Sequence, residues 1–271
     1  MKRRNQIIMT AFLCCIALVS CHKNETQPDN NNGNTENPGG GGGNQQNPST
    51  AVIIHNAVTD YDGNSYDAVQ LGNQIWMAEN LHTTHFANGA AIPEGPSDYS
   101  PSRCTPPNGD ANTYGYLYNW PAVVHGSNGS AANPSGVQGV CPTGWHVPSD
   151  AEWTQMTDYV GTQSEFVCNG SSNSIAKALA SDHGWQMSGG NECAVCYDQS
   201  TNNSTGFSAF PVGRNFSESF DGFGNTAYFW TATYSYGNNV YYRFISSQNV
   251  SVESSDCFMY GYGFSVRCVK N

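Results

Sequence analysis

The chain has 271 residues and a formal net charge of −11, because 21 Asp and Glu outnumber 10 Lys and Arg. Proteins that bind nucleic acids neutralise phosphates with clustered Lys and Arg, and after residue 4 the basic residues of this chain are scattered. The composition therefore argues against nucleic acid as a partner.

The first 20 residues have the organisation of a bacterial signal peptide. Lys2, Arg3 and Arg4 precede an apolar run over residues 7–19, which is too short to span a bilayer. The run ends in Leu-Val-Ser before Cys21, an arrangement that resembles a lipobox. It predicts cleavage before Cys21 and lipidation of the Cys21 thiol; the alternative is an ordinary secretory signal with an incidental cysteine.

Residues 21–50 comprise the lipidated cysteine and a predicted disordered tether. They are rich in Asn, Gly, Gln and Pro, and residues 39–43 are five consecutive glycines, so the segment cannot bury enough apolar surface to fold. A flexible chain of this length reaches about 30 Å. We expect residues 51–271 to form one globular domain, held by the lipid at the outer membrane and exposed at the cell surface.

The first part of the domain predicts a β-hairpin. Residues 52–54 have the character of a short strand, and residues 65–71 and 74–77 alternate on either side of a Gly-Asn turn. Residues 87–112 predict a loop. Residues 114–124 are the densest aromatic stretch and predict a buried strand that enters a short helical turn; the alternative is a platform on which sugar rings stack.

Residues 141–153 predict a fixed turn that leads into a well-capped helix. Ser149 and Glu152 have the spacing of a capping box, and Pro148 keeps the helix from starting earlier. Gly161 is expected to end the helix. Apolar residues at helical spacing predict one buried stripe, formed by Trp153, Met156 and Val160.

The last part of the chain has the alternation of antiparallel strands. Residues 174–180 predict a second, short helix. Strands are predicted at residues 227–233, 240–245, 250–252 and 263–269. Helices early and strands late indicate an α+β fold.

Seven cysteines lie in the expected domain, and an exported location favours disulfides, with at least one thiol left over. Cys193-x-x-Cys196 fits half a zinc site, a redox pair, or two separate disulfide partners, and the compartment favours the last. The sequence does not determine how Cys104, Cys168, Cys193, Cys196 and Cys257 pair.

Six motifs occur in a fixed order, at residues 72–81, 116–120, 136–140 running into the central helix, 206–211, 229–233 and 263–269. Together they resemble the Fibrobacter succinogenes major paralogous domain, which is common in exported lipoproteins of Bacteroidetes and Fibrobacteres. The resemblance covers about residues 58–270. The helix start and the closing segment are also similar to the sulfatase-modifying-factor group, whose fold is C-type-lectin-like.

The resemblance implies an α+β, C-type-lectin-like (sulfatase-modifying-factor-like) domain with one main helix, a second short helix, antiparallel strands and chain ends that come together. Such a layout brings the entrance of the main helix beside the last strand and so implies a Cys141–Cys268 disulfide. Closing so long a loop stabilises a fold by roughly 4–5 kcal/mol. Arg267 is expected to pair with a buried carboxylate such as that of Glu152.

No recognised catalytic motif occurs, neither G-x-S-x-G nor H-E-x-x-H. His82 and His85 lie in a loop-like stretch without a nearby carboxylate constellation and are expected to be solvated, whereas His146 is expected to be a buried structural histidine. Residues 60–64 resemble a calcium loop but lack its bidentate glutamate. We therefore expect no metal or cofactor, with one turn-bound Ca²⁺ as the alternative.

We expect a binding or adhesion domain without catalysis, whose ligand is an extracellular glycan or protein. The candidate ligand-binding residues are Trp120, Trp230, Tyr241 and Arg243. One alternative is a structural or tip component of a surface assembly, and a less favoured one is an enzyme related to the sulfatase-modifying group.

Overall fold

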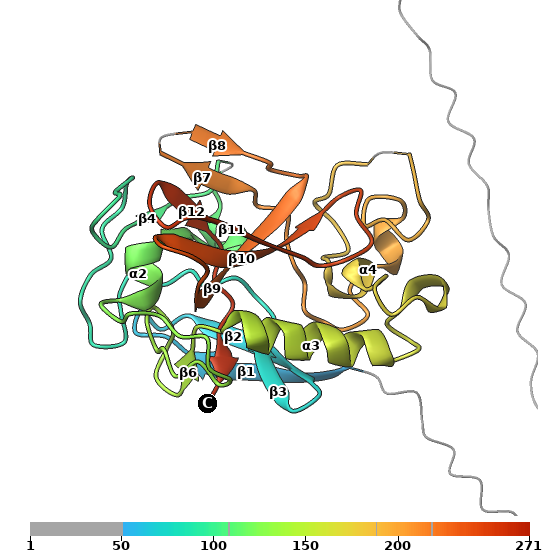
Figure 1. Cartoon of the computed structure of the whole chain (residues 1–271), viewed down its shortest axis with the longest axis horizontal. Coiled ribbons are helices and arrows are strands. Elements are labelled where there is room, and N and C mark those ends of the chain that lie inside the picture. Colours follow the sequence, from blue (N-terminus) through green and yellow to red (C-terminus); the bar gives the residue numbers. More distant parts are fainter. Residues whose placement is uncertain (1–50, 108, 188, 218) are drawn as a thin grey trace, which may run out of the picture. The chain divides into compact units, whose positions relative to one another are not determined.

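Three antiparallel sheets and one long helix make up the folded part of the chain (Figure 1). The computed structural model describes residues 51–107, 109–187, 189–217 and 219–271, within one compact unit, Gln46–Asn271. The predicted signal peptide, the lipidation site Cys21 and the tether lie outside the described residues. No helix among those described is long and apolar enough to cross a membrane.

The first sheet joins both ends of the folded part, in the order β1-β2-β3-β13-β6. Its strands are β1 (Val52–Thr59), β2 (Ser65–Leu71), β3 (Gln74–Met77), β13 (Val269–Lys270) and β6 (Trp145–His146). β2 and β3 confirm the predicted hairpin. Because β13 pairs with β3, the two ends of the domain share one sheet, as expected.

The second sheet has the order β4-β5-β12-β7-β8, and the third has the order β11-β10-β9. The second contains β4 (Arg103–Cys104), β5 (Leu117–Asn119), β12 (Tyr262–Phe264), β7 (Arg214–Phe216) and β8 (Ser219–Asp221). The third contains β9 (Thr226–Tyr234), β10 (Asn239–Ser246) and β11 (Glu253–Phe258). All these strand pairings are antiparallel, which confirms the mixed α+β class.

Two strand predictions were wrong in their bounds. Residues 250–252 form no strand, because the Val250 carbonyl accepts a hydrogen bond from Ala176 N instead of a sheet partner; β11 begins at Glu253. Residues 263–269 are divided between β12 and β13, since the chain crosses from the second sheet to the first between Phe264 and Val269.

The helices are α1 (Ala111–Tyr114), α2 (Trp120–Val124), α3 (Asp150–Thr162) and α4 (Ala176–Leu179), with 3₁₀ turns η1 (Cys168–Gly170) and η2 (Gln199–Thr201). In α3 both hydrogen bonds of the Ser149–Glu152 capping box are present. The helix continues through Gly161 to Thr162, so Gly161 does not end it. A Cβ at Gly161 would lie 2.5 Å from the Ser172 carbonyl oxygen, so the glycine permits close packing of that segment.

Helix α3 packs against strands of the first and third sheets, and Figure 1 shows it crossing between the blue and red strands. Trp153 is 1% exposed, and its ring centroid lies 4.8 Å from that of Trp76 and 5.4 Å from that of Phe229. Met156 and Val160 are fully buried. The predicted apolar stripe is therefore the central contact of this part of the core.

A buried ion pair fixes the entrance of α3. Glu152 Oε1 lies 2.7 Å from His146 Nε2, and both side chains are 2% exposed. Glu152 Oε2 accepts hydrogen bonds from Ser149 N and Ser135 N, while His146 Nδ1 contacts Asn271 Oδ1 at 2.7 Å. The expectation of a structural histidine at position 146 is confirmed.

Within the described part of the chain, Arg267 pairs neither with Glu152 nor with another carboxylate. The side chain is 0% exposed; Nε donates to Asn80 Oδ1 at 2.7 Å, and the terminal nitrogens donate to the carbonyls of Met77, Phe207 and Ser208. The expected partner was wrong because neutral carbonyls of two distant segments, together with the Asn80 side chain, take up the guanidinium donors.

The expected disulfide between Cys141 and Cys268 is present, and a second joins Cys168 to Cys193. Cys193 is therefore a disulfide partner and not half of a zinc site. Cys104 and Cys257 form no disulfide among the described residues.

The two disulfides differ in the length of chain that they close, 127 residues for Cys141–Cys268 against 25 for Cys168–Cys193. From loop-closure entropy we expect the free energy of unfolding to fall by about 5 kcal/mol when Cys141 and Cys268 are replaced by alanine, and by about 3.5 kcal/mol when Cys168 and Cys193 are replaced. Urea unfolding of the two double variants measures both losses. A larger loss for the Cys168/Cys193 variant would show that loop entropy does not set the ranking.

Replacing Arg267 by Met should lower the free energy of unfolding by about 3–5 kcal/mol, because it leaves buried acceptors without donors. Arg267→Lys should cost less but still destabilise, since one ammonium cannot reproduce the planar set of donors. Urea unfolding with exposed Lys270→Met as control checks this. Equal stability of Arg267→Met and Lys270→Met would contradict it.

The His146–Glu152 pair predicts a pH window of greatest stability. Burial lowers the pKa of His146, but the hydrogen bonds with Glu152 and Asn271 raise it above its ordinary 6.5 overall. Burial raises the pKa of Glu152, but the bonds from His146 and Ser149 lower it below its ordinary 4.5 overall. The His146 contribution is lost as pH rises through its raised pKa, and the Glu152 contribution as pH falls through its lowered pKa, so both are fully present between 4.5 and 6.5.

Glu152→Gln should therefore lose stability chiefly inside this window and have a flatter profile of unfolding free energy against pH. Chemical denaturation inside and on both sides of the window measures the profile, with exposed Glu165→Gln as control. An unchanged profile in Glu152→Gln would show that the pair does not control the pH dependence.

Candidate functional site

The two tryptophans proposed as ligand-binding residues are core residues. Trp120 is 2% exposed and Trp230 is 0% exposed, and their ring centroids lie 5.6 Å apart. The Trp230 indole donates to the Tyr118 carbonyl at 2.7 Å. Neither ring offers a face to a ligand, so the prediction that Trp120 and Trp230 bind a ligand was wrong. The predicted buried strand and helical turn at residues 114–124 is confirmed, and its alternative, a platform for sugar rings, is not.

Arg243 joins β10 to the first turn of α3. Its Nε lies 2.7 Å from Asp150 Oδ1, its Nη2 donates to Thr154 Oγ1 at 2.7 Å, and the residue is 7% exposed. A cation this enclosed is a structural link and not a ligand contact. Tyr241, the fourth candidate, is half-buried on β10 opposite Asp256 on β11.

The predicted calcium-like turn is occupied by donors from the protein. Asp60 accepts hydrogen bonds from Asn64 and Tyr66, and Asp62 accepts them from Thr84 N and contacts His85 Nδ1 at 2.5 Å. His85 is therefore paired and not simply solvated. Although burial raises the pKa of Asp62, these hydrogen bonds lower it to about 2 overall. Among the described residues, no group of three or more His, Cys, Asp or Glu is placed to hold a metal ion.

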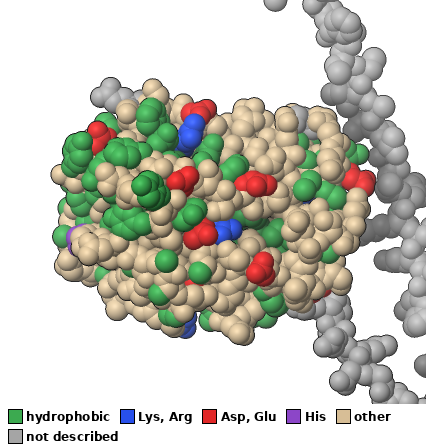
Figure 2. Space-filling view, viewed as in Figure 1, with side chains coloured by type: hydrophobic (Ala, Val, Ile, Leu, Met, Phe, Trp, Pro, Cys, Tyr) green, Lys and Arg blue, Asp and Glu red, His purple; other side chains and the backbone are tan. Residues whose placement is uncertain are grey.

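Exposed aromatic rings gather elsewhere, where the second and third sheets meet. We call this surface the aromatic patch and define it as Tyr99, Phe216, Phe258, Tyr260 and Tyr262. Tyr99 is 77% exposed, Phe258 50% and Phe216 48%. The Tyr260 centroid lies 4.8 Å from that of Tyr99 and 5.2 Å from that of Phe258, and Phe216 lies 4.6 Å from Tyr262. Figure 2 shows hydrophobic side chains gathered at the upper left, over the part where Figure 1 labels β7, β12 and β11.

The patch is centred on the tight connection from β11 to β12. Met259 N donates to the Asn238 carbonyl at 2.9 Å, and Ser217 N donates to the Gly261 carbonyl at 2.7 Å. Gly261 has φ +83°, a conformation that other residues adopt at a cost. The backbone of the connection is thus tied to two neighbouring turns, on either side of Tyr260.

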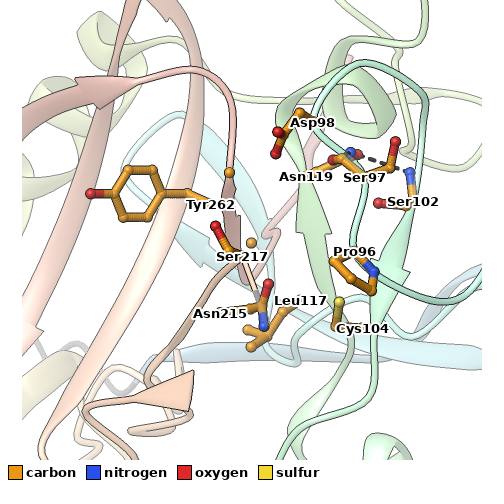
Figure 3. A pocket seen from close by; sticks show the side chains of 12 residues that line it. Pro96, Ser97, Asp98, Ser102, Cys104, Leu117, Asn119, Asn215, Ser217 and Tyr262 are labelled. Carbon is orange, nitrogen blue, oxygen red and sulfur yellow. Dashed lines mark hydrogen bonds between the residues drawn. The ribbon is translucent and has the colours of Figure 1, made fainter. Parts of the chain in front are cut away.

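A small hollow, open to solvent and with room for about one water molecule, lies beside the patch (Figure 3). Asp98, Ser97 and Ser102 line one side of it and Asn215 and Ser217 the other.

Asn119 anchors the loop that carries Asp98 and Tyr99. Its Oδ1 accepts from Ser102 N at 2.9 Å, and its Nδ2 donates to the carbonyls of Ser97 at 2.6 Å and Ser100 at 2.8 Å. All its hydrogen-bonding groups are engaged within the chain, so Asn119 positions the loop and leaves ligand contacts to its neighbours.

The carboxylate of Asp98 borders both the patch and the hollow. A Cβ built on Gly261 would lie 3.8 Å from Asp98 Oδ1 and 3.5 Å from Phe216 Cε2, so these two groups face the same space. Sequence reasoning missed the site, because Tyr99 and Asp98 lie in a stretch that predicts only loop. The exposed tyrosines among Gly, Pro and Ser were the available signal.

Neither half-buried thiol near the patch has the lowered pKa of an activated cysteine. Burial, with the charge of Glu94, raises the pKa of Cys104, which lines the hollow. Burial and the charge of Asp256 raise the pKa of Cys257 to about 12. The described site therefore offers contact surface and hydrogen-bonding groups, and these two thiols remain protonated at neutral pH.

Comparison with known proteins identifies a family but no close individual relative. No curated protein and no solved structure matches the chain. The sequence model of the Fibrobacter succinogenes major domain matches residues 69–270, from β2 to β13, and so includes almost the whole folded part. The chain belongs to the Fibrobacter succinogenes major domain family.

Proposed function

We propose that this protein is a lipid-anchored, surface-exposed protein of the outer membrane whose domain binds an extracellular glycan through the aromatic patch. The signal-peptide pattern and Cys21 support the anchor, and the Gly- and Asn-rich segment supports a tether. The function is binding without catalysis.

The observation that carries the proposal is the gathering of exposed and half-buried rings in two groups in ring contact, Tyr99–Tyr260–Phe258 and Phe216–Tyr262, on either side of Gly261. Folded proteins bury most aromatic side chains, and contiguous exposed apolar patches mark interaction sites. Tyrosine rings combine an apolar face with a polar hydroxyl, which suits a sugar ring that has apolar C–H faces and hydroxyl edges. Beside the patch, the exposed carboxylate of Asp98 can accept hydrogen bonds from sugar hydroxyls.

A C-type-lectin-like architecture belongs to this proposal as well. The α+β class, the chain ends in one sheet and the Cys141–Cys268 disulfide support it. It remains an analogy of fold, and the ligand is argued from the patch and not from the fold.

A second candidate is a protein-binding surface within a surface assembly, such as the tip of an appendage. Phe216 and Phe258 favour it, since their rings have no polar group and are about half exposed. In that case the purified domain would bind no polysaccharide and would co-purify with a partner through the same patch.

Tyr99→Ala should weaken glycan binding about tenfold or more, because it removes the most exposed ring of the patch. Tyr197→Ala is the matched control, since Tyr197 is 51% exposed and lies outside the patch. Affinity electrophoresis of the tether-free domain in gels that contain soluble polysaccharides, with calcium and with chelator, measures both variants. Equal binding by Tyr99→Ala and the unmodified domain would place the site elsewhere.

A further inference from the structure

The third sheet ends in a strand whose outer backbone groups are unoccupied. β11 is the end strand of the order β11-β10-β9, and it pairs with β10 without a register shift. Met259 N donates to the Asn238 carbonyl in the same register, so these two residues form a bonded pair. Because bonded pairs alternate along an antiparallel ladder, the backbone groups that point away from β10 are those of Ser254, Asp256 and Phe258. Within the described part of the chain, these groups have no hydrogen-bond partner.

The other sheet ends are short, bent or covered. β4 and β6 have two residues each, and β8 has three. The pairing of β1 with β2 contains a register shift, and Asn56 within β1 has φ +51°. Along the outer side of β9, Trp230 N donates to the Ser265 carbonyl. Among the described strands, β11 is therefore the long and regular edge that can accept a further strand.

The open edge is acidic. Glu253 and Asp256 lie on β11, and neither forms an ion pair with a Lys or Arg of the described residues. Asp256 Oδ2 accepts a hydrogen bond from Asn239 Nδ2 at 3.1 Å, a neutral donor that leaves the negative charge uncompensated. Two copies of this edge would bring the same carboxylates together, and like charges across a strand pair are destabilising. The edge therefore favours a positively charged strand over a second copy of itself.

A cleft of about 340 Å³ lies at the start of β11. Asp158 and Thr162 of α3 line it, as do Ser251 and Val252, which directly precede β11. Asp158 is exposed, and its side chain has no hydrogen bond or ion pair with another described residue. Because α3 has no basic residue in its last turn, the negative end of the helix dipole adds to the charge of Asp158. The cleft thus suits a long cationic side chain.

We propose that an extended segment of a partner protein, bearing Lys or Arg, pairs with the free edge of β11 and extends the third sheet by one strand. This inference goes beyond the proposed glycan binding and does not depend on it. In an antiparallel pair, the residue opposite Asp256 exchanges backbone hydrogen bonds with it and has its side chain on the same face. Ser254 Oγ lies 3.3 Å from Asp150 Oδ1, so this face is the one beside α3. Basic residues at alternate positions of the segment therefore lie beside Asp256 and extend toward Asp158 in the cleft.

Three blocked hexapeptides of alternating Lys and Val test the backbone pairing: one unmodified, one N-methylated at the Lys residues and one N-methylated at the Val residues. The unmodified and Val-methylated peptides should bind the compact unit, Gln46–Asn271, in an NMR titration that shifts the amide signals of β11. The Lys-methylated peptide should bind at least about tenfold more weakly, because the Lys N–H groups face β11. Equal binding of the two methylated peptides, or no binding of the unmodified one, would overturn strand addition.

A hexapeptide of alternating Glu and Val tests the charge of the segment. It should bind at least about tenfold more weakly than the Lys and Val peptide, and added salt should reduce the difference. Asp256→Asn should lower the preference for the Lys peptide about threefold, whereas Glu165→Gln, which removes an exposed carboxylate outside β11, should keep it. Equal affinity for the Lys and Glu peptides would overturn the basic segment as the occupant.

Ser254→Pro removes one outward N–H from the edge and should weaken binding of the Lys peptide about tenfold. Ser254→Ala is the matched control, because it removes the hydroxyl and keeps the N–H, and it should bind as the unmodified domain does. Equal binding by the two variants would contradict the proposal. The methylated peptides test the same hydrogen bonds without any change to the domain, so the result does not depend on the folding of Ser254→Pro.

Discussion

The buried guanidinium of Arg267 is the constraint on which the arrangement of the sheets depends. It lies where the chain leaves β12 in the second sheet and enters β13 in the first, and it donates to the carbonyls of Met77, Phe207 and Ser208. These carbonyls come from segments far from Arg267 in the chain, and a buried carbonyl without a hydrogen-bond donor is costly. One planar side chain with five donors satisfies several of them, and the Cys141–Cys268 disulfide holds the next residue.

The position of the aromatic patch follows from this constraint. β12 begins directly after the turn that carries Tyr260 and Gly261, so the short strand that leads to Arg267 also holds the end of that turn. The turn is in addition bonded to Asn238 and Ser217 in two neighbouring connections. The proposed binding surface therefore lies on connections, while the strands supply rigid support, which is the usual division in folded domains.

Much of the fold could be predicted from the sequence because its signals are local. The capping box of Ser149 and Glu152 and the hairpin around Gly72 depend on residues a few positions apart. The crossing at residues 265–268 has no local signal: the alternation continues through it, and only the pairing of β12 and β13 with different sheets reveals it. The prediction of a carboxylate partner for Arg267 failed for the same reason, because the carbonyls that accept its hydrogen bonds belong to residues about 60 and 190 positions away in the chain.

The candidate site could not be predicted, because aromatic content alone does not separate a core from a surface. Trp120 and Trp230 lie in strand- and helix-forming stretches with apolar neighbours, and they fill the core. Tyr99 lies among Ser, Asp and Pro, where no apolar neighbour in the chain can cover its ring. The better predictor is the neighbourhood of a ring: an aromatic residue in a polar loop stays exposed unless a distant segment covers it. Here Tyr260 comes from such a distant segment and packs beside Tyr99, but it leaves most of the Tyr99 ring exposed. Because exposed apolar patches mark interaction sites, the two rings together form a candidate binding surface.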